Sequence, residues 1–230
     1  MSGRAPAGEG RRKPDAATLA RRLAVYVITD REQAERQGGR KLLDVCRAAL
    51  EAGAGTLQLR GKGWSGRELY ELGLALRRLT EEAGALFLVD DRVDVAQAVR
   101  ADGVHVGQDD LPARVARAIL GPGAIVGVSA ATPEEARRAE ADGADYVGAG
   151  SVWPTGSKAD AGAPIGLEGL RAVVAATRLP VVAIGGVDAG RAREARAAGA
   201  AGVAVISAVM AAPDPARAVR ELLAGTEGRR

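Results

Sequence analysis

Two carboxylates stand close to the ends of consecutive apolar runs in this chain. Asp91 closes the run that begins at Leu86, and Asp110 lies just past the next run. Neighbouring parallel strands lie about 4.8 Å apart, so two such carboxylates repel each other unless a cation lies between them. Mg²⁺ is commonly held by one or two carboxylates and completed by water and substrate phosphate oxygens. The pair therefore predicts a magnesium site. The alternatives are a helix cap at Asp110 and a simple contact with Arg92 at Asp91.

Three cations occur near the ends of these runs. Arg60 and Lys62 stand two positions apart at the end of another run, so both side chains can point to the same side. Lys158 lies in the loop Val152–Pro164, which contains two prolines and two glycines and is long enough to act as a lid. Together with Mg²⁺ these cations predict a site for a highly charged anion such as pyrophosphate. Ordinary surface salt bridges are the alternative.

A second anion site is predicted from different residues. Gly185-Gly186 directly follows an apolar run, and glycine lets backbone N–H groups approach an oxyanion closely. Ile206-Ser207 ends the last run, and the hydroxyl groups of Thr155 and Ser157 are available from the long loop. These residues favour a monophosphate ligand, with tight packing of helix on strand as the alternative. Two anion sites around one metal imply two phosphorylated small-molecule substrates.

Covalent catalysis has few candidates in this sequence. The one cysteine, Cys46, falls inside the first helical segment after the first run, where we expect it to pack in the core. Any Ser-His or Cys-His mechanism must use His105, the one histidine. No carboxylate or lysine stands out as a buried general base. The residue types therefore favour electrostatic stabilisation of a departing pyrophosphate.

Eight short apolar runs must position these residues. The runs are Ala24–Thr29, Thr56–Arg60, Leu86–Asp91, Val104–Gly107, Ile125–Ala130, Tyr146–Gly150, Val181–Gly186 and Val203–Ser207. Segments of helical period lie between them, such as Arg40–Ala52, Gly66–Ala83, Pro133–Ala141 and Leu167–Thr177. Apolar strands without polar alternation indicate a parallel sheet with both faces covered by helices.

Glycines recur between a helical segment and the next run, in the motifs Glu51-Ala-Gly-Ala-Gly-Thr, Ala101-Asp-Gly-Val-His, Ala141-Asp-Gly-Ala-Asp-Tyr and Ala198-Gly-Ala-Ala-Gly-Val. We expect a glycine of each motif to end a helix in the left-handed conformation. No GxGxxG turn follows the first run, as an open doubly wound sheet would require. The sequence therefore predicts an α/β fold, a single-domain (β/α)8 TIM barrel, with the site where strands end and loops begin.

Composition agrees with one globular domain. The chain has 230 residues, of which 47% are hydrophobic, enough for a core of normal size. Only 3% are aromatic, so few side chains are available to stack on the bases of single-stranded nucleic acid. The formal charge is +3, but residues 1–22 hold six cationic and two acidic side chains, which leaves −1 for the remainder. We expect a basic disordered tail over 1–22, a catalytic barrel over 23–224 and a short tail over 225–230. No apolar run suggests a membrane span or secretion signal, so we expect a cytoplasmic protein that binds neither membrane nor nucleic acid.

From about residue 24 to 223 the chain resembles the thiamine-phosphate synthase family. The resemblance depends on Gln58-Leu-Arg60-Gly-Lys62, Asp90-Asp91, Ala101-Asp-Gly-Val-His-Val-Gly-Gln-Asp-Asp110, Gly127-Val-Ser129, Ala144-Asp-Tyr-Val-Gly, Pro154-Thr-Gly-Ser-Lys158 and Ala183-Ile-Gly-Gly186. It implies a transferase of thiamine biosynthesis. A pyrimidine methyl pyrophosphate ionises, pyrophosphate leaves with Mg²⁺, and the nitrogen of a thiazole phosphate captures the pyrimidine cation.

The resemblance also implies roles for individual residues. Asp91 and Asp110 become metal ligands, and Arg60, Lys62, Lys158 and Ser129 become the catalytic groups. The pyrimidine pyrophosphate is assigned to Gln58, Leu59, Arg60, Gly61, Lys62, Asp90, His105, Ser129 and Lys158. The thiazole phosphate is assigned to Thr155, Gly156, Ser157, Gly186, Ile206 and Ser207.

Three positions depart from the family's usual pattern. Asp90 stands where Asn is usual, Gly61 where an acidic residue is common, and Ser157 where Thr is common. Ser157 keeps its hydroxyl group, whereas Asp90 loses an amide donor and adds negative charge beside the pyrophosphate. We expect Asp90 to affect the reaction rate or the metal affinity, but not the class of reaction.

Two other function classes remain open at this point. An isomerase related to thiazole tautomerase has no pyrophosphate site, so it does not need Arg60, Lys62, Asp91 and Asp110 together. A noncatalytic phosphate-binding barrel keeps Gly185-Gly186 and tolerates loss of the metal pair. Release of pyrophosphate from the two substrates with Mg²⁺ separates all three. The sequence does not indicate the oligomeric state.

Overall fold

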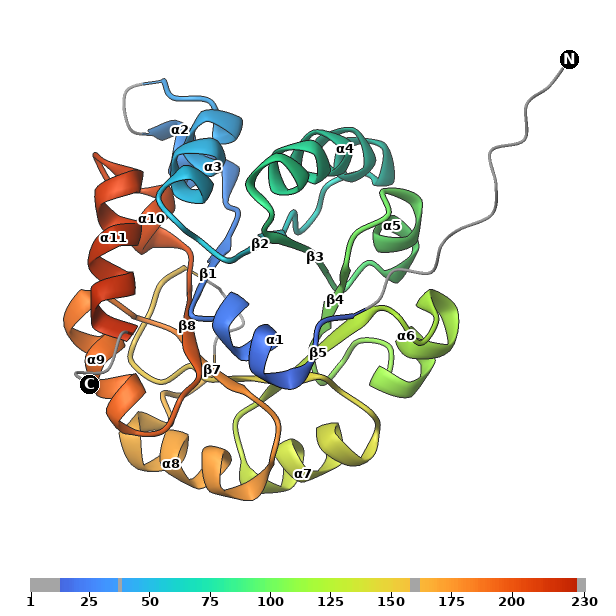
Figure 1. Ribbon diagram of the computed structural model, residues 1–230, viewed down its shortest axis with the longest axis vertical. Coiled ribbons are helices and arrows are strands. Elements are labelled where there is room, and N and C mark those ends of the chain that lie inside the picture. Colours follow the sequence, from blue (N-terminus) through green and yellow to red (C-terminus); the bar gives the residue numbers. More distant parts are fainter. Residues whose placement is uncertain (1–12, 37–38, 158–161, 227–230) are drawn as a thin grey trace, which may run out of the picture.

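Eight parallel strands close into one barrel, which confirms the predicted (β/α)8 architecture (Figure 1). The computed structural model describes residues 13–36, 39–157 and 162–226. The strands are β1 (Val25–Ile28), β2 (Thr56–Leu59), β3 (Leu86–Asp90), β4 (Gly103–Val106), β5 (Ile125–Ala130), β6 (Tyr146–Ala149), β7 (Val181–Ile184) and β8 (Gly202–Val205). Each strand pairs with the next in sequence, and β1 pairs with β8 to close the barrel.

Helices surround the barrel. They are α1 (Ala16–Arg22), α2 (Arg31–Arg36), α3 (Leu42–Glu51), α4 (Gly66–Ala83), α5 (Val93–Ala98), α6 (Ala113–Leu120), α7 (Pro133–Ala141), α8 (Gly166–Ala176), α9 (Ala189–Ala197), α10 (Ser207–Met210) and α11 (Pro215–Thr226). Most strand residues are buried, because one face of each strand packs on helices and the other fills the barrel. Local signals set some boundaries: Ser65 and Thr132 each form a capping box, at the starts of α4 and α7.

The prediction that a left-handed glycine ends the helix before a strand is confirmed in three of the four motifs. Gly53, Gly143 and Gly199 have positive φ angles of 103°, 82° and 98°. Gly103 instead lies inside β4, and Arg100, with φ of 54°, takes the left-handed position after α5. Gly103 is needed for a different reason: a Cβ atom there would lie 1.8 Å from the carbonyl oxygen of Ile125.

The N-terminal boundary differs from the prediction. Residues 16–22, expected within a disordered tail, form α1, which begins with the Asp15 side chain accepting a hydrogen bond from the Thr18 N–H at 2.8 Å. Leu19 is buried, and the Thr56 hydroxyl donates to the Arg22 carbonyl at 2.9 Å. In Figure 1, α1 lies across the barrel rather than in the surrounding ring of helices. The helix was missed because a short segment with one buried leucine shows no periodicity.

The C-terminal end also differs slightly, since α11 continues to Thr226. Residues 1–12 and 227–230 of the predicted tails lie outside the described residues. Among the described helices, none combines the length and apolar character that a membrane span requires.

Candidate functional site

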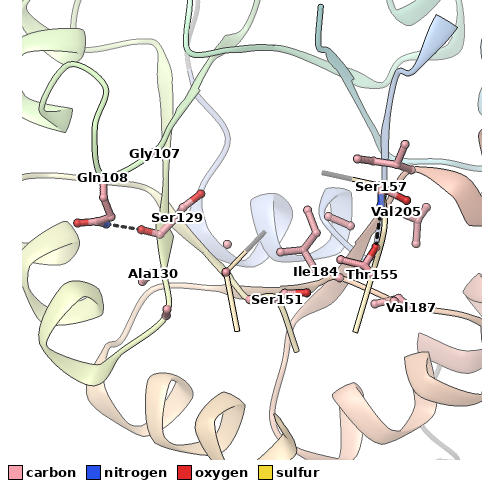
Figure 2. A pocket seen from close by; sticks show the side chains of 18 of the residues that line it. Gly107, Gln108, Ser129, Ala130, Ser151, Thr155, Ser157, Ile184, Val187 and Val205 are labelled. Atoms are coloured by element: carbon pink, nitrogen blue, oxygen red, sulfur yellow. Dashed lines mark hydrogen bonds between the residues drawn. The ribbon is translucent and has the colours of Figure 1, made fainter. Parts of the chain in front are cut away.

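A cavity of about 540 Å³ opens at the carboxyl ends of the strands, where the sequence placed the site (Figure 2). It brings together residues that are far apart in the chain. Its lining includes Lys62, Asp110, Ser129, Thr155, Ser157, Gly185, Gly186, Ile206 and Ser207. Closed barrels place all strand-end loops on one rim, so these predicted residues of both anion sites share one cavity.

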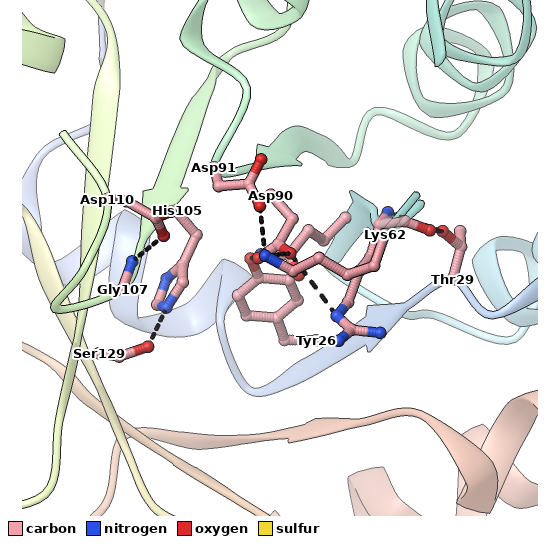
Figure 3. Close-up of polar contacts among 11 residues, drawn as sticks. Tyr26, Thr29, Lys62, Asp90, Asp91, His105, Gly107, Asp110 and Ser129 are labelled. Atoms are coloured by element: carbon pink, nitrogen blue, oxygen red, sulfur yellow. Dashed lines mark hydrogen bonds and ion pairs between the residues drawn. The ribbon is translucent and has the colours of Figure 1, made fainter. Parts of the chain in front are cut away.

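Cations and carboxylates meet beyond β2 and β3, around Lys62, which lines the cavity (Figure 3). The Arg60 Nε atom lies 3.6 Å from an Asp90 carboxylate oxygen, and the Lys62 Nζ atom lies 3.9 Å from the same oxygen. Lys62 also donates a short hydrogen bond to Asp91. This hydrogen bond, with the negative charges of Asp90, Asp91 and Asp110, raises the pKa of Lys62 above its usual value. Lys62 therefore stays charged among three carboxylates.

The backbone holds Asp91 in an uncommon conformation. Its φ angle is 51°, in the left-handed region that non-glycine residues rarely adopt, and its N–H donates to the carbonyl of His105 at 2.8 Å. Arg92 does not pair with Asp91, since it forms hydrogen bonds of 2.9 and 2.6 Å with Asp94. The contact between Asp91 and Arg92 considered as an alternative is therefore replaced by a contact with Lys62.

Asp110 does not cap the helix that follows it. Its carboxylate accepts a hydrogen bond from the Gly107 N–H at 2.7 Å, and α6 begins with Pro112 in the cap position and no side-chain cap. Asp91 and Asp110 also line one shared groove at the outer edge of the barrel. The capping alternative is thus excluded by the geometry.

The donor set is compatible with Mg²⁺ but not with a metal held by protein alone. Within the described ranges, no three His, Cys, Asp or Glu side chains form a group able to hold a metal ion. Asp91 and Asp110 line one groove, and both carboxylates act on the charge of Lys62. Mg²⁺ typically takes one or two carboxylates and completes its shell with water and phosphate oxygens, so this pair fits a metal that arrives with a phosphorylated substrate.

A glycine cradle lines the same cavity, directly after β7. Gly185 and Gly186 have consecutive φ angles of 96° and 64°, and a Cβ atom would lie 2.1 Å from the Ser151 hydroxyl oxygen or 2.6 Å from the Pro154 carbonyl oxygen, respectively. Only glycine fits at both positions, and such turns present backbone N–H groups toward an anion. The neighbouring Ser207 opens the short helix α10.

Arg191 supports this cradle and was missed by the sequence reasoning. Its Nη1 atom donates to the Gly186 carbonyl at 2.6 Å, and its guanidinium lies 5.5 Å from the ring centroid of Trp153. It stands in the first turn of α9, five residues past the glycine pair. In the sequence, the only hint of this role is a cationic residue five positions after the glycine pair.

A small pocket of about 30 Å³ inside the barrel shares Ser129, Gly148, Ile184 and Ala204 with the cavity, and this floor of the cavity holds a buried polar cluster. Gln58, His105 and Ser129 were predicted, whereas Tyr26 and Tyr146 were not. Both tyrosines are among the largest fully or nearly fully buried side chains, and burial raises the pKa of each well above its usual value. In the sequence, the one hint of a large side chain here is the glycine at position 127 inside an apolar run. In the structure, a Cβ atom at Gly127 would lie 2.1 Å from the Tyr146 ring.

Lys158, Leu59 and Gly61, three of the predicted site residues, are not among the described residues that line the cavity. Lys158 lies outside the described residues. Leu59 is fully buried, and its side chain lies next to Gly73 of α4, so only its backbone is available to the cavity. A Cβ atom at Gly61 would lie 2.6 Å from the ring of Trp64, which in turn stacks beneath the Arg31 guanidinium at 4.0 Å. Trp64 therefore explains why this chain has no acidic side chain at position 61.

Comparison with known proteins gives a consistent result. The family model described as thiamine monophosphate synthase matches residues 25–209. Thiamine-phosphate synthase of Moorella thermoacetica is 60% identical over 185 residues, covering 80% of this chain and 88% of that protein. The protein of the same name from Pyrococcus furiosus is 52% identical over 204 residues, covering 89% and 95%. A solved thiamine phosphate pyrophosphorylase structure from P. furiosus superimposes with a TM-score of 0.81 at 50% identity, covering 90% of this chain and 97% of that one.

Proposed function

The chain belongs to the thiamine monophosphate synthase family and is a transferase of thiamine biosynthesis, and from that premise we propose the reaction and the residues that perform it. The substrates are 4-amino-2-methylpyrimidine methyl pyrophosphate and a thiazole phosphate. The bond between the pyrimidine methylene carbon and the pyrophosphate oxygen breaks, and its electron pair leaves with pyrophosphate. The lone pair of the thiazole nitrogen then forms the new carbon–nitrogen bond of thiamine phosphate.

The observation that carries this proposal is the division of one cavity into two anion-binding sides. Lys62 lines the cavity and shares the Asp90 carboxylate with Arg60, and the backbone cradle of Gly185 and Gly186 lines the same cavity beyond β7. The cationic side suits the more highly charged pyrophosphate. The cradle, with Ser207 and the loop hydroxyl groups of Thr155 and Ser157, suits the monophosphate of the thiazole.

Asp91 and Asp110 would hold Mg²⁺ on the pyrophosphate side. When bound, the metal supplies positive charge to the leaving pyrophosphate. Lys62 already lies against the same carboxylates with a raised pKa, so it remains protonated and available to the pyrophosphate oxygens. Because negative charge on the leaving group grows in the transition state, these fixed cations bind the transition state more tightly than the substrate.

The floor of the cavity suits the pyrimidine. Gln58 is 1% exposed, and its Oε1 atom has no hydrogen-bond partner among the described residues. An exocyclic amino group is the kind of donor this oxygen lacks, and an unsatisfied buried acceptor is costly until it is paired. Gln58 would therefore orient the ring through its amino group, which also delocalises the developing cation.

Electrostatics rather than covalent catalysis is the consistent route. Cys46 is buried in α3, and burial raises the pKa of its thiol to about 12, so it supplies no thiolate near neutral pH. The only histidine is hydrogen-bonded at both ring nitrogens inside the barrel. Neither residue is placed as a nucleophile.

The test is an assay of pyrophosphate release by the purified chain with both substrates, with and without Mg²⁺. Release that requires both substrates and Mg²⁺, together with formation of thiamine phosphate, supports the proposal. Isomerisation of the thiazole phosphate without pyrophosphate release indicates a tautomerase instead. Binding of the thiazole phosphate without turnover indicates a noncatalytic barrel.

A further inference from the structure

Five side chains form a continuous hydrogen-bonded line through the interior of the barrel. The Gln58 Nε2 atom donates to the Tyr26 hydroxyl oxygen at 2.6 Å, and the hydroxyl oxygens of Tyr26 and Tyr146 lie 3.1 Å apart. The Tyr146 hydroxyl lies 2.9 Å from His105 Nδ1, and His105 Nε2 lies 2.9 Å from the Ser129 hydroxyl. Figure 3 shows Tyr26, His105 and Ser129 in this region. The line begins in the core and ends at the cavity.

The Gln58 amide sets which group donates and which accepts in the hydrogen bonds that follow it. The amide nitrogen of Gln58 only donates, so the Tyr26 oxygen accepts there and Tyr26 must place its own hydrogen elsewhere. The hydrogen-bonded line offers it the Tyr146 oxygen, 3.1 Å away. Tyr146 then accepts from Tyr26 and donates its hydrogen to His105 Nδ1.

Both phenols are suited to act as donors. Tyr26 is 2% exposed and Tyr146 is fully buried, and this burial raises the pKa of each, so both stay protonated. Packing keeps the line in register, since the Tyr146 ring fills the space left by Gly127, and Gly148 leaves room for the imidazole ring of His105. A misdirected hydroxyl would leave a buried donor or acceptor unpaired, which is costly.

We propose that Tyr26 and Tyr146 are positioning residues that hold His105 with its hydrogen on Nε2, and so turn Ser129 into a hydrogen-bond donor toward the ligand. With a hydrogen bond accepted at Nδ1, the Nε2–H group donates to the Ser129 oxygen. The Ser129 hydroxyl hydrogen then points away from His105, into the cavity that Ser129 lines. This places a fixed neutral donor beside the ligand without adding charge. Only the identity of that ligand, the pyrimidine pyrophosphate, rests on the proposed function.

The tautomer can be measured directly because the chain contains one histidine. Protein grown with ¹⁵N-labelled histidine gives one pair of ring nitrogen signals, whose shifts and couplings show which nitrogen carries the hydrogen. For the ligand-free protein we expect hydrogen on Nε2 and none on Nδ1. Hydrogen on Nδ1 would make His105 the donor to Tyr146 and Ser129 the donor to His105, and would overturn the proposal, whatever reaction the protein catalyses.

A variant tests whether Tyr146 sets this state. Tyr146→Phe keeps the ring in its space and removes only the donor, so we expect the Nδ1-protonated tautomer to become populated. Tyr70→Phe is the matched control, because Tyr70 is exposed on α4 and its change should leave the spectrum as it is. An unchanged tautomer in folded Tyr146→Phe refutes the role of Tyr146. If this variant fails to fold, the spectrum of the unaltered protein still decides the direction of the line.

Kinetics test whether the line acts through Ser129. Loss of one oriented hydrogen bond predicts that Tyr146→Phe lowers kcat/KM by about tenfold. In a Ser129→Ala background the same change should have almost no further effect, because the group that receives the orientation is gone. Additive losses would show that Tyr146 acts on folding alone and would overturn the positioning role. A protein inactive with both substrates fails the proposed function but leaves the tautomer experiment valid.

Discussion

Replacing Asp90 with asparagine tests how the cationic side of the cavity is tuned. The change removes a carboxylate whose oxygen lies 3.6 Å from Arg60 Nε and 3.9 Å from Lys62 Nζ. The Asp90 and Arg60 side chains are 11% and 12% exposed, whereas that of Lys62 is 50% exposed. The pair with Lys62 is therefore strongly screened, and the pair with Arg60 dominates the effect.

The magnitude follows from this geometry. Opposite unit charges about 4 Å apart attract by about 4 kcal/mol at an effective dielectric constant near 20. Desolvation of the two buried partners offsets much of this value. Asp90→Asn removes the ion pair with Arg60 and a charge that repels pyrophosphate, so we expect pyrophosphate to bind at least about tenfold more tightly, equivalent to about 1.4 kcal/mol. Turnover should be kept or raised, while the midpoint of thermal unfolding falls because Arg60 loses a partner.

The assay compares three quantities in purified Asp90→Asn and the unaltered protein. They are the inhibition constant of pyrophosphate, the Mg²⁺ concentration at half-maximal turnover, and the unfolding midpoint. Glu221→Gln on α11 makes the same change in net charge far from the cavity and serves as the control. We expect an unchanged Mg²⁺ requirement, since Asp91 and Asp110 supply the proposed metal pair. A much higher Mg²⁺ requirement with lower turnover would mean that Asp90 is itself a metal ligand, and the reasoning above would be refuted.

Three further predictions follow from the structure. Asp91→Ala or Asp110→Ala should lower kcat by at least about 10²-fold in the pyrophosphate-release assay, and near-normal turnover in both would remove the metal assignment. Gly186→Ala should raise KM for the thiazole phosphate by about tenfold because of strain at positive φ, with KM for the pyrimidine pyrophosphate as the internal control; equal losses would show that the two sides are not distinct. Hydrogen bonds from Thr177 and then Arg178 lower the pKa of Glu140 to about 2, so its stabilising effect is present above pH 4.5 and lost as the pH falls toward 2. The difference in unfolding midpoint between the unaltered protein and Glu140→Gln should therefore shrink over that range, and a constant difference would contradict it.

Much of the fold was predictable because its signals are local. Each of the eight predicted runs overlaps one strand of the barrel, although β4 and β8 begin one residue before their runs, and the predicted limits of α4 and α7 agree with the structure. A buried parallel strand needs an uninterrupted apolar run, and a helix end needs a cap within a few residues. The errors occurred where these signals are weak, at α1 with its single buried leucine and at Gly103, whose role is set by the adjacent strand rather than by its own helix.

The sequence by itself determined the residue types of the site and the end of the barrel on which they lie. A parallel barrel brings all strand ends to one rim, so Lys62, Asp110 and Ser207 were expected to meet before any distance was known. Only the tertiary structure decided which group pairs with which. Lys62 rather than Arg92 contacts Asp91, and Tyr146 meets His105 from 41 positions along the chain. Such pairings depend on the register between strands and on the space left by Gly127, which are properties of packing across the barrel and leave no periodic trace in the chain.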